Sequence, residues 1–247
     1  MIVNTAAYHF VAVADPQGLA DAIAEQADQR GLKGTALVAG EGINLFLAGT
    51  GEGIDGFYDW LRQDVRFAGL RIKVSLSETL PFARMKTKVK PEIISFRHDQ
   101  ATPLQQARAP SVGPRQLRDW LRQGHDDQGR RVVMLDTRNQ QEVVHGTFED
   151  ALTLPITRFT ELPQALAPHR EALADATVVS FCTGGIRCEK AALWMREDGM
   201  ANVLQLEGGI LGYFEEVGGE GYAGGCFVFD ERVALDPQLR PLGDVAA

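Results

Sequence analysis

The fold of the larger part of the chain is decided by the segment Phe181-Cys182-Thr183-Gly184-Gly185-Ile186-Arg187-Cys188-Glu189-Lys190. It starts at the end of the run 177–181, which is nearly all apolar and therefore typical of a strand buried on both faces. It leads into a helical stretch at 189–197. Ligands of open parallel sheets bind at the carboxyl ends of the strands. The glycine-containing loop between strand and helix is therefore the candidate site.

This loop predicts a reactive cysteine. Gly184 and Gly185 let the backbone turn its N–H groups inward as an anion-binding nest, and the helix amino terminus adds positive potential. Cys182 opens the loop and is expected to be a thiolate with a lowered pKa, the alternative being a buried core thiol. The planar fork of Arg187 is expected to hold an anion. Cys188, on the first helical turn, is either a packing residue or a redox partner.

Further apolar runs extend the same pattern through the second half of the chain. They alternate with helical stretches, which predicts a parallel sheet flanked by helices, an α/β fold. The expected strands are 132–136, 177–181 and 203–206, and the expected helices begin at Pro114 and cover 159–165, 169–173 and 189–197.

The first half of the chain has a different pattern. Asp15 and Pro16 predict the start of a helix that ends at Gly31, because an Asp cap and a Pro in the first turn both favour helix initiation. A second helix is expected at 51–67, and strands are expected at 8–13, 34–39, 43–48 and 70–76. The order β-α-β-β-α-β predicts a ferredoxin-like (acylphosphatase-like) α+β domain.

A chain of 247 residues is long enough for two small domains. The ferredoxin-like domain is expected to cover 1–97 and to include a basic segment at 84–97. Residues 98–113 are polar and proline-containing and are expected to be a linker. The second domain is expected at 114–223, followed by a C-terminal tail at 224–247.

Charge is unevenly distributed. Residues 1–97 hold 11 Lys and Arg and 11 Asp and Glu, whereas residues 98–247 hold 14 and 22 and so carry the whole net charge of −8. The segment 84–97 holds five cations and one Glu, a local sum of +4. An acidic chain is a poor candidate for nucleic-acid binding, but this segment is a basic patch that fits it.

Several classes of protein are excluded or disfavoured. The longest stretch without Asp, Glu, Lys or Arg is 14 residues, 1–14, whereas a spanning helix needs about 20 apolar residues, so we expect neither a membrane partner nor a signal peptide and predict a cytoplasmic location. Three cysteines argue against a disulfide framework. No zinc-type spacing is present, so no metal site is expected.

Two stretches resemble the rhodanese family. Cys182-x4-Arg187 at a strand–helix junction is similar to the rhodanese active-site loop, and the stretch Asp136-Thr-Arg138, with Glu142 and His145 following, is similar to a second rhodanese segment. The resemblance implies a rhodanese-like second domain in which Asp136 and Arg138 support the loop. A phosphatase is the alternative for a Cys–Arg loop of this kind. The tyrosine phosphatase loop has one residue more between Cys and Arg, which disfavours a phosphatase. His145 is expected to be structural.

Five motifs in one order are similar to the tRNA uridine hydroxylase family: 34–44, 85–93, 182–190, 207–210 and 225–233. The resemblance implies an oxidoreductase that uses molecular oxygen to form 5-hydroxyuridine at the wobble position, position 34, of certain tRNAs. It implies that Cys182 is catalytic and that Thr183, Gly184, Gly185, Ile186 and Arg187 form the active-site loop. Many members continue into a Cys-rich tail, whereas no cysteine follows Cys226 here, so Cys226 is expected to be structural.

The resemblance favours tRNA, at its anticodon region, as the partner of the basic segment; no protein partner is inferred. Arg84, Lys86, Lys88 and Lys90 are expected to track phosphates, the alternative being lysines that protect a sheet edge. No flavin, nucleotide or metal fingerprint is present, so no cofactor is identified. Two chemistries stay open: addition of the Cys182 thiolate to carbon 6 of uracil, or a persulfide on Cys182. Two other classes also stay open, a sulfurtransferase and a silent binding module.

Overall fold

The computed structural model describes residues 1–98 and 101–242. The chain divides into two compact units, each with its own core: unit 1 is Met1–Ser95 with Asp230–Arg232, and unit 2 is Phe96–Phe229 with the chain from Val233 on. The predicted pairing of a ferredoxin-like domain with an α/β domain is confirmed. The domain limits expected from the sequence stay a prediction, and residues 99–100 of the expected linker and 243–247 of the expected tail lie outside the described residues.

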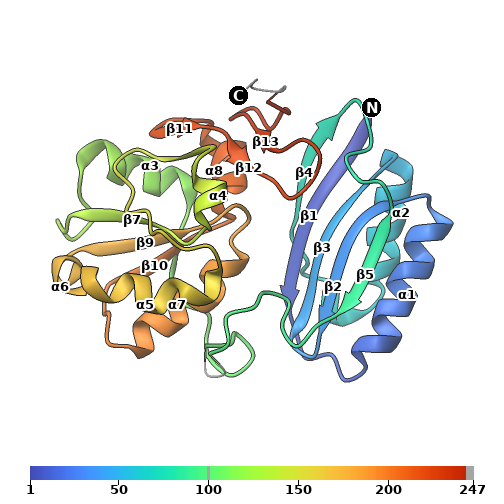
Figure 1. The fold of residues 1–247 in the computed structure, drawn as a ribbon, viewed down its shortest axis with the longest axis horizontal. Helices are drawn as coiled ribbons and strands as arrows, with labels where there is room; N and C mark the ends of the chain where they lie inside the picture. The colour runs from blue at the N-terminus through green and yellow to red at the C-terminus, as the bar shows by residue number, and fades with distance from the viewer. Residues whose placement is uncertain (99–100, 243–247) are drawn as a thin grey trace. The chain divides into compact units, whose positions relative to one another are not determined.

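Unit 1 contains a five-stranded sheet in the order β4-β1-β3-β2-β5 (Figure 1). Its neighbouring strands are antiparallel except β2 and β5, which are parallel. The strands are β1 (Ile2–Phe10), β2 (Lys33–Ala39), β3 (Gly42–Gly49), β4 (Ile72–Ser77) and β5 (Met85–Val89). The basic segment therefore begins with an edge strand.

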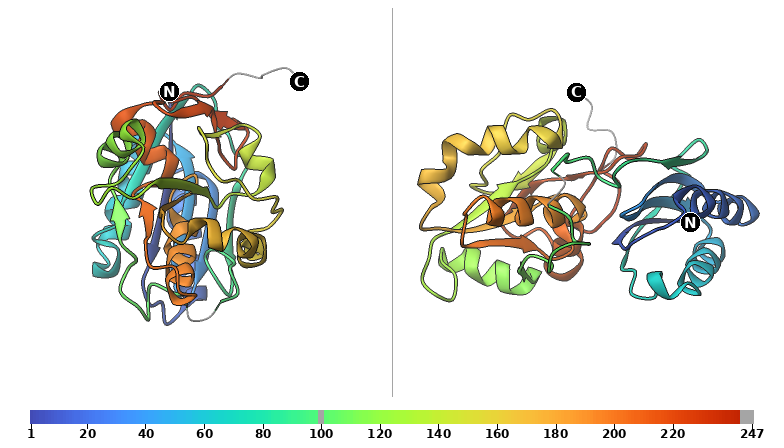
Figure 2. Two further views of the ribbon diagram at one scale, coloured as in Figure 1. Left: turned by 90° about the vertical axis from the view of Figure 1, so that its left-hand side faces the viewer. Right: turned by 90° about the horizontal axis from the view of Figure 1, so that it is seen from below.

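Two helices, α1 (Pro16–Gln29) and α2 (Gly51–Arg62), cover one face of this sheet (Figures 1 and 2). The Asp15 carboxylate accepts a hydrogen bond from the N–H of Gly18 at 2.9 Å, which confirms the predicted cap. Ile23 of α1 and Phe57 of α2 are fully buried in the core between helices and sheet. A 3-10 turn at Val65–Phe67 completes the second predicted helix.

The first strand differs from its prediction. The apolar run 8–13 predicted a strand there, but β1 begins at Ile2 and ends at Phe10. The strand extends toward the amino terminus because it pairs along its length with β3 and, over 2–7, with β4. After Phe10 the chain turns toward α1, and only the N–H groups of Val11 and Val13 still bond to the β2–β3 turn.

Unit 2 is built on a parallel sheet in the order β6-β10-β9-β7. The strands are β6 (Ser111–Val112), β7 (Val132–Asp136), β9 (Thr177–Phe181) and β10 (Val203–Leu206), the last three at their predicted positions. The helices are α3 (Pro114–Gln123), α4 (Gln140–Val143), α5 (Leu162–Leu166), α6 (Arg170–Leu173), α7 (Ile186–Glu197) and α8 (Gly209–Val217), with 3-10 turns at Phe159–Glu161 and Ala167–His169.

Among the departures from the sequence prediction in unit 2 are β6, the start of α7, and α8. β6 lies inside the expected linker 98–113, because two residues next to polar sequence give no apolar run to detect. α7 begins at Ile186, three residues before the predicted start, because Gly185 caps it in the left-handed conformation. α8 was not predicted, since it opens with glycine, a residue that disfavours helices.

Two small antiparallel sheets complete unit 2. One pairs β8 (Gly146–Phe148) with β11 (Tyr222–Gly224), and the other pairs β12 (Cys226–Phe227) with β13 (Ala234–Leu235). Segments of the expected tail are thus ordered parts of the unit. Across residues 1–98 and 101–242, none of the helices combines the length and apolar character that a membrane crossing requires.

Candidate functional site

The Cys182 loop connects the carboxyl end of β9 to α7, as the sequence predicts. All five residues of β9 are buried, and of the loop only Gly184 is more than slightly exposed. Two hydrogen bonds from the first turn of α8 hold the loop. The N–H groups of Ile210 and Leu211 donate to the carbonyls of Cys182 and Thr183 at 2.9 and 3.0 Å. The candidate site is thus a rigid, fully packed loop rather than a flexible one.

The first residue of α8 has to be glycine. Gly209 has φ +63°, and a Cβ atom there would lie 2.4 Å from the carbonyl oxygen of Cys182 and 2.7 Å from the nitrogen of Gly185. Any side chain would push the helix away from the loop. The motif 207–210, which the sequence analysis singled out without a role, is therefore the support of the Cys182 loop.

The Cys182 sulfur is buried and stabilised as an anion. Its Sγ accepts a hydrogen bond from the N–H of Gly185 at 3.1 Å. Burial by itself would raise the pKa of Cys182, but the hydrogen bond with Cys188, the charge of Arg187 and the backbone N–H groups of Arg187 and Gly185 together lower it to about 5. The structure therefore holds this side chain as a thiolate at neutral pH.

Cys188 stays a thiol beside that thiolate. Burial, followed by the hydrogen bond and charge of Cys182, raises the pKa of Cys188 well above its ordinary value. Its Sγ lies 3.7 Å from the hydroxyl of Thr137. The Thr137 hydroxyl donates to the carbonyl of Phe181 at 2.9 Å, which ties the end of β7 to the end of β9. Cys188 is therefore the hydrogen-bond donor, and Cys182 is the anion.

The Arg187 fork, expected to hold an anion, pairs with a carboxylate of this chain and does not face an open site. Its two Nη atoms donate to the two carboxylate oxygens of Glu142, both at 2.6 Å. Arg187 is 5% exposed and Glu142 is fully buried. The fork is turned toward Glu142 because a buried guanidinium requires a compensating carboxylate. The third nitrogen of the guanidinium, the buried Nε, has no hydrogen-bond partner within the part of the chain that the structure describes.

Asp136 and Arg138 form a second buried ion pair at the carboxyl end of β7. Arg138 Nη2 donates to Asp136 Oδ2 at 2.6 Å and to the carbonyl of Gly146 at 2.7 Å, and the hydroxyl of Thr147 donates to Asp136 at 2.8 Å. Asp136 is directly opposite Phe181 in the sheet. The pair therefore fixes β7 to β8 next to the Cys182 loop, and its supporting role stays a prediction.

Thr183 connects the loop to β12. Its hydroxyl donates to the carbonyl of Phe227 at 3.3 Å. Cys226 is fully buried in the core of unit 2, and burial raises its pKa to about 12. His145 lies with its ring 5.3 Å from the ring of Phe227. Cys226 and His145 thus both pack within unit 2.

The basic segment lies in unit 1. Lys86 and Lys88 are exposed side chains of β5, which is paired with β2 in parallel, and Arg84 and Lys90 are exposed directly before and after the strand. Because successive side chains of a strand alternate, the lysines project from one face of it. Both of the earlier interpretations, phosphate contact and protection of a sheet edge, are compatible with this placement.

The sequence pattern predicts no role for Glu142. It stands 45 positions from Arg187, and only its place in the stretch with Asp136 and Arg138 marked it. Within residues 1–98 and 101–242, no three His, Cys, Asp or Glu side chains gather in the manner of a metal site.

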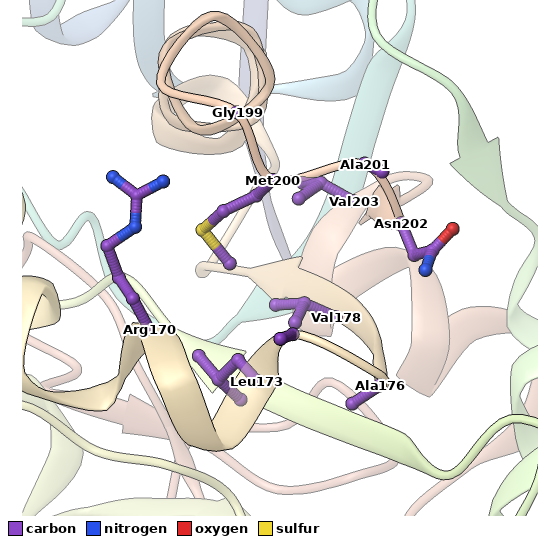
Figure 3. A pocket seen from close by; sticks show the side chains of 10 residues that line it. Arg170, Leu173, Ala176, Val178, Gly199, Met200, Ala201, Asn202 and Val203 are labelled. Atoms are coloured by element: carbon purple, nitrogen blue, oxygen red, sulfur yellow. The ribbon is translucent and has the colours of Figure 1, made fainter.

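A separate hollow of about 190 Å³ lies at the other end of the unit 2 sheet (Figure 3). It is lined by Leu173, Val178, Met200 and Val203, with Arg170 at its side, as Figure 3 shows. Val178 and Val203 stand at the amino ends of β9 and β10, whereas Cys182 follows the carboxyl end of β9. The hollow is therefore not part of the Cys182 site.

Two family models match this chain. Residues 2–93 match the UPF0176 acylphosphatase-like domain, and residues 117–216 match the rhodanese-like domain. Among solved structures, a rhodanese-related protein from Thermoplasma volcanium is 22% identical, with a TM-score of 0.36, and the alignment covers 44% of this chain and 93% of that one.

Curated relatives match over the full length. A protein of Xanthomonas campestris pv. campestris (strain B100) named tRNA uridine(34) hydroxylase is 72% identical over 247 residues, which are 100% of this chain and 97% of that protein. One of Xylella fastidiosa (strain 9a5c) with the same name is 68% identical over 99% of this chain and 95% of that protein. With this identity over both units, the chain belongs to the tRNA uridine(34) hydroxylase family.

Proposed function

We propose that this protein is an oxidoreductase that hydroxylates carbon 5 of uridine 34 in tRNA, with molecular oxygen as co-substrate and 5-hydroxyuridine as product. One oxygen atom enters carbon 5, and the other leaves as water with two electrons and two protons from a cellular reductant. The observation that carries the proposal is the buried Cys182 thiolate, with a pKa of about 5, in a chain whose full-length relatives are named tRNA uridine(34) hydroxylase. In this proposal Cys182 is the catalytic residue, and 183–187 form the loop that holds it.

The thiolate is the common starting point of both open chemistries. In the first, Cys182 Sγ adds to carbon 6 of uracil, which makes carbon 5 nucleophilic toward an oxidant. Once carbon 5 has taken up one oxygen atom, loss of its proton and expulsion of the Cys182 thiolate restore the double bond. In the second, a persulfide on Cys182 takes part. Gly185, Arg187 and Cys188 stabilise negative charge on the sulfur in either case. Their part is electrostatic: they keep the sulfur ionised before the substrate arrives.

Arg187 is proposed to act on the sulfur through its charge, with Glu142 fixing the guanidinium in place. The bidentate pair leaves the arginine no rotational freedom, so the charge stays beside Cys182. Arg138 and Asp136 are proposed to support the Cys182 loop by anchoring β8 to β7. These are positioning residues.

tRNA is proposed to bind through its anticodon region, with Arg84, Lys86, Lys88 and Lys90 contacting phosphates. Four exposed cations on and around one edge strand support this. The enzyme is proposed to work in the cytoplasm, where its tRNA substrate is. Apart from molecular oxygen as co-substrate, the proposal includes no cofactor.

A sulfurtransferase is the second candidate, because residues 117–216 match a rhodanese-like domain and Cys182 stands at the position of the sulfur-carrying cysteine in the resemblance. Such an enzyme transfers sulfur from thiosulfate to cyanide without any need for unit 1. That assay on the purified chain separates the two candidates.

The test is mass spectrometry of tRNA nucleosides from a strain in which the gene is deleted. We expect 5-hydroxyuridine to be absent from the deletion strain, to return when the gene is restored, and to fall when the restored strain grows without oxygen. Unchanged 5-hydroxyuridine after deletion, with thiosulfate–cyanide activity in the purified protein, would transfer the assignment to the sulfurtransferase.

A further inference from the structure

The face of the unit 1 sheet opposite α1 and α2 has an unusual composition. Side chains that face the helices are aliphatic and buried, such as Ala36, Leu45 and Leu47. Those between them in sequence point the other way. We name this second surface the open face and define it by Ala6, Tyr8, Phe10, Lys33, Thr35, Leu37, Phe46, Lys73, Lys86 and Lys88.

The strand register places these side chains in rows across the sheet. One row is Lys86, Thr35, Phe46, Ala6 and Lys73, running from β5 through β2, β3 and β1 to β4. Directly paired residues of neighbouring strands share a face. A lysine therefore stands at each end of this row, on opposite edge strands, with an aromatic ring on the central strand β3.

The next row adds a second ring beside the first. It consists of Lys88, Leu37, Asn44 and Tyr8, from β5 to β1. Tyr8 is two residues from Ala6, which is opposite Phe46, so Tyr8 and Phe46 are diagonal neighbours on adjacent strands. Such neighbours are about 7–8 Å apart, within reach of aromatic side chains. Phe10 extends the group, its ring 6.1 Å from that of Tyr8.

The charged side chains of the five strands have one sign. The five strands contain no Asp or Glu, and five of the six lysines of the chain stand on them or directly after β5. Lys73 Nζ lies 5.7 Å from the centre of the Tyr8 ring. Tyr8, Phe10, Phe46 and Lys73 are half-buried. The open face thus combines aromatic rings with cations at both edges.

Two other segments of unit 1 reach this face through polar contacts. The amide of Asn44 donates to the carbonyl of Ile93 at 3.3 Å, and Arg232 donates to the hydroxyl of Ser75 at 2.7 Å. Asn44 is on β3, close to the β2–β3 turn, and Ser75 is on the edge strand β4. These contacts border the aromatic group.

We propose that the open face binds single-stranded RNA, with unstacked bases on Tyr8 and Phe46 and phosphates on Lys73, Lys86 and Lys88. Sheets of the RNA-recognition type use exposed aromatic side chains in this way to stack two or three bases. The assignment rests on the proposed function, because it takes RNA as the substrate, and it identifies the rings that the basic segment alone does not.

The composition argues against two alternatives for this face, a protein–protein interface and the protection of a sheet edge. Lysines on both edge strands, with no acidic residue on the five strands, favour a polyanionic partner over a protein surface. Protection of a sheet edge needs charges only on edge strands. Lys33 is on the inner strand β2, and Tyr8 and Phe46 are on inner strands, where they protect no edge.

The test compares leucine and aromatic substitutions at the two central rings. Binding of a fluorescent single-stranded oligouridylate to the full chain is measured by anisotropy, with a double-stranded RNA of equal length as a second probe. Phe46→Leu and Tyr8→Leu should each weaken oligouridylate binding about tenfold, because base stacking on one ring contributes about 1–3 kcal/mol. Phe46→Tyr and Tyr8→Phe should bind as wild type does.

Trp60→Leu is the matched control, because Trp60 is a half-buried aromatic residue of α2, which packs against the other face of the same sheet. It should leave oligouridylate affinity unchanged. Thermal melting identifies any variant that has lost its fold. If a leucine variant has lost it, Phe46→Tyr and Tyr8→Phe are compared with wild type instead.

Wild-type affinity in Phe46→Leu and Tyr8→Leu would overturn the proposal and leave a protein partner as the occupant of the face. Equal loss of affinity in Phe46→Leu and Phe46→Tyr would also overturn it, because stacking would not be the cause. Nucleoside analysis separates this from the proposed function: 5-hydroxyuridine formed by a chain that ignores oligouridylate contradicts only the open-face proposal. The expected binding without any 5-hydroxyuridine contradicts only the proposed function.

Discussion

The Cys182 loop and the open face differ in how their residues depend on one another. Around Cys182, two buried ion pairs hold the charged side chains: Arg187 with Glu142, and Arg138 with Asp136. On the open face, half-buried rings and lysines that are half-buried or exposed recur along neighbouring strands, and each would contact a different part of a ligand. The loop is therefore expected to fail when one group is removed, whereas the face is expected to weaken in steps.

Dielectric environment is the physical reason for this difference. A charge in a buried network interacts strongly with its neighbours, and an unpaired one is costly. Exposed charges are screened by water and salt, so each contributes little and independently. Substitutions in the two regions test whether the chain really separates chemistry from binding in this way.

The largest effect is expected from Cys182→Ser. The hydroxyl is close to the thiol in size, but its pKa is far too high for it to ionise, so 5-hydroxyuridine should disappear from the tRNA of a strain that carries this variant. Thermal melting of the purified variant should stay close to that of wild type. Normal 5-hydroxyuridine in this strain would refute the thiolate mechanism.

Glu142→Gln should have the next largest effect, on stability. It leaves the buried Arg187 charge without its carboxylate, which costs about 3–5 kcal/mol of unfolding free energy in comparable buried pairs. Asp119→Asn is the control, because Asp119 pairs with Arg118 at the surface and should change stability by less than about 1 kcal/mol. Urea denaturation of both variants measures the difference; equal midpoints would mean that the Glu142–Arg187 pair does not hold the loop.

Lys86→Gln, Lys88→Gln and Lys90→Gln combined should weaken tRNA binding in a salt-dependent way. Loss of three phosphate contacts should flatten the slope of log affinity against log salt by about 2–3 units. Any thiosulfate–cyanide activity should persist, because Cys182 belongs to unit 2. An unaltered slope together with aggregation, detected by light scattering, would instead support lysines that protect the edge of β5.

Cys188 should give the smallest effect. Cys188→Ser keeps a hydrogen-bond donor beside Cys182 and should retain measurable hydroxylation. Cys188→Ala removes the donor, so the pKa of Cys182 should rise from about 5 while the charge of Arg187 still acts on it. Thiolate absorbance measured against pH reports this shift: wild type and Cys188→Ser should ionise at lower pH than Cys188→Ala. Identical titrations of all three would show that Cys188 does not stabilise the thiolate.

The β-α-β-β-α-β order of unit 1, three strands of the unit 2 sheet and the Cys182 loop could be predicted, because a buried strand followed by Gly184 and Gly185 is a local pattern. The partner of Arg187 could not be predicted in the same way, since Glu142 is on α4 and reaches Arg187 only in the folded unit. The support of the loop by Gly209 was hidden for a similar reason: a helix that begins with glycine resembles a turn in sequence.

The open face was also out of reach of a local pattern. Tyr8 and Phe46 are 38 positions apart, and they become neighbours only through the register of β1 and β3. The lysines of 84–90 were visible as a cluster, whereas Lys33 and Lys73 joined them only in the folded sheet.

The separation of chemistry from binding is tested most directly by measuring tRNA affinity and 5-hydroxyuridine content together for two variants, Cys182→Ser and the triple lysine variant. We predict that Cys182→Ser binds tRNA with wild-type affinity and forms no 5-hydroxyuridine. The triple variant should lose affinity, keep the low pKa of Cys182, and recover hydroxylation when it is overproduced. Loss of tRNA affinity in Cys182→Ser, or a triple variant that stays inactive at any protein level, would contradict the account.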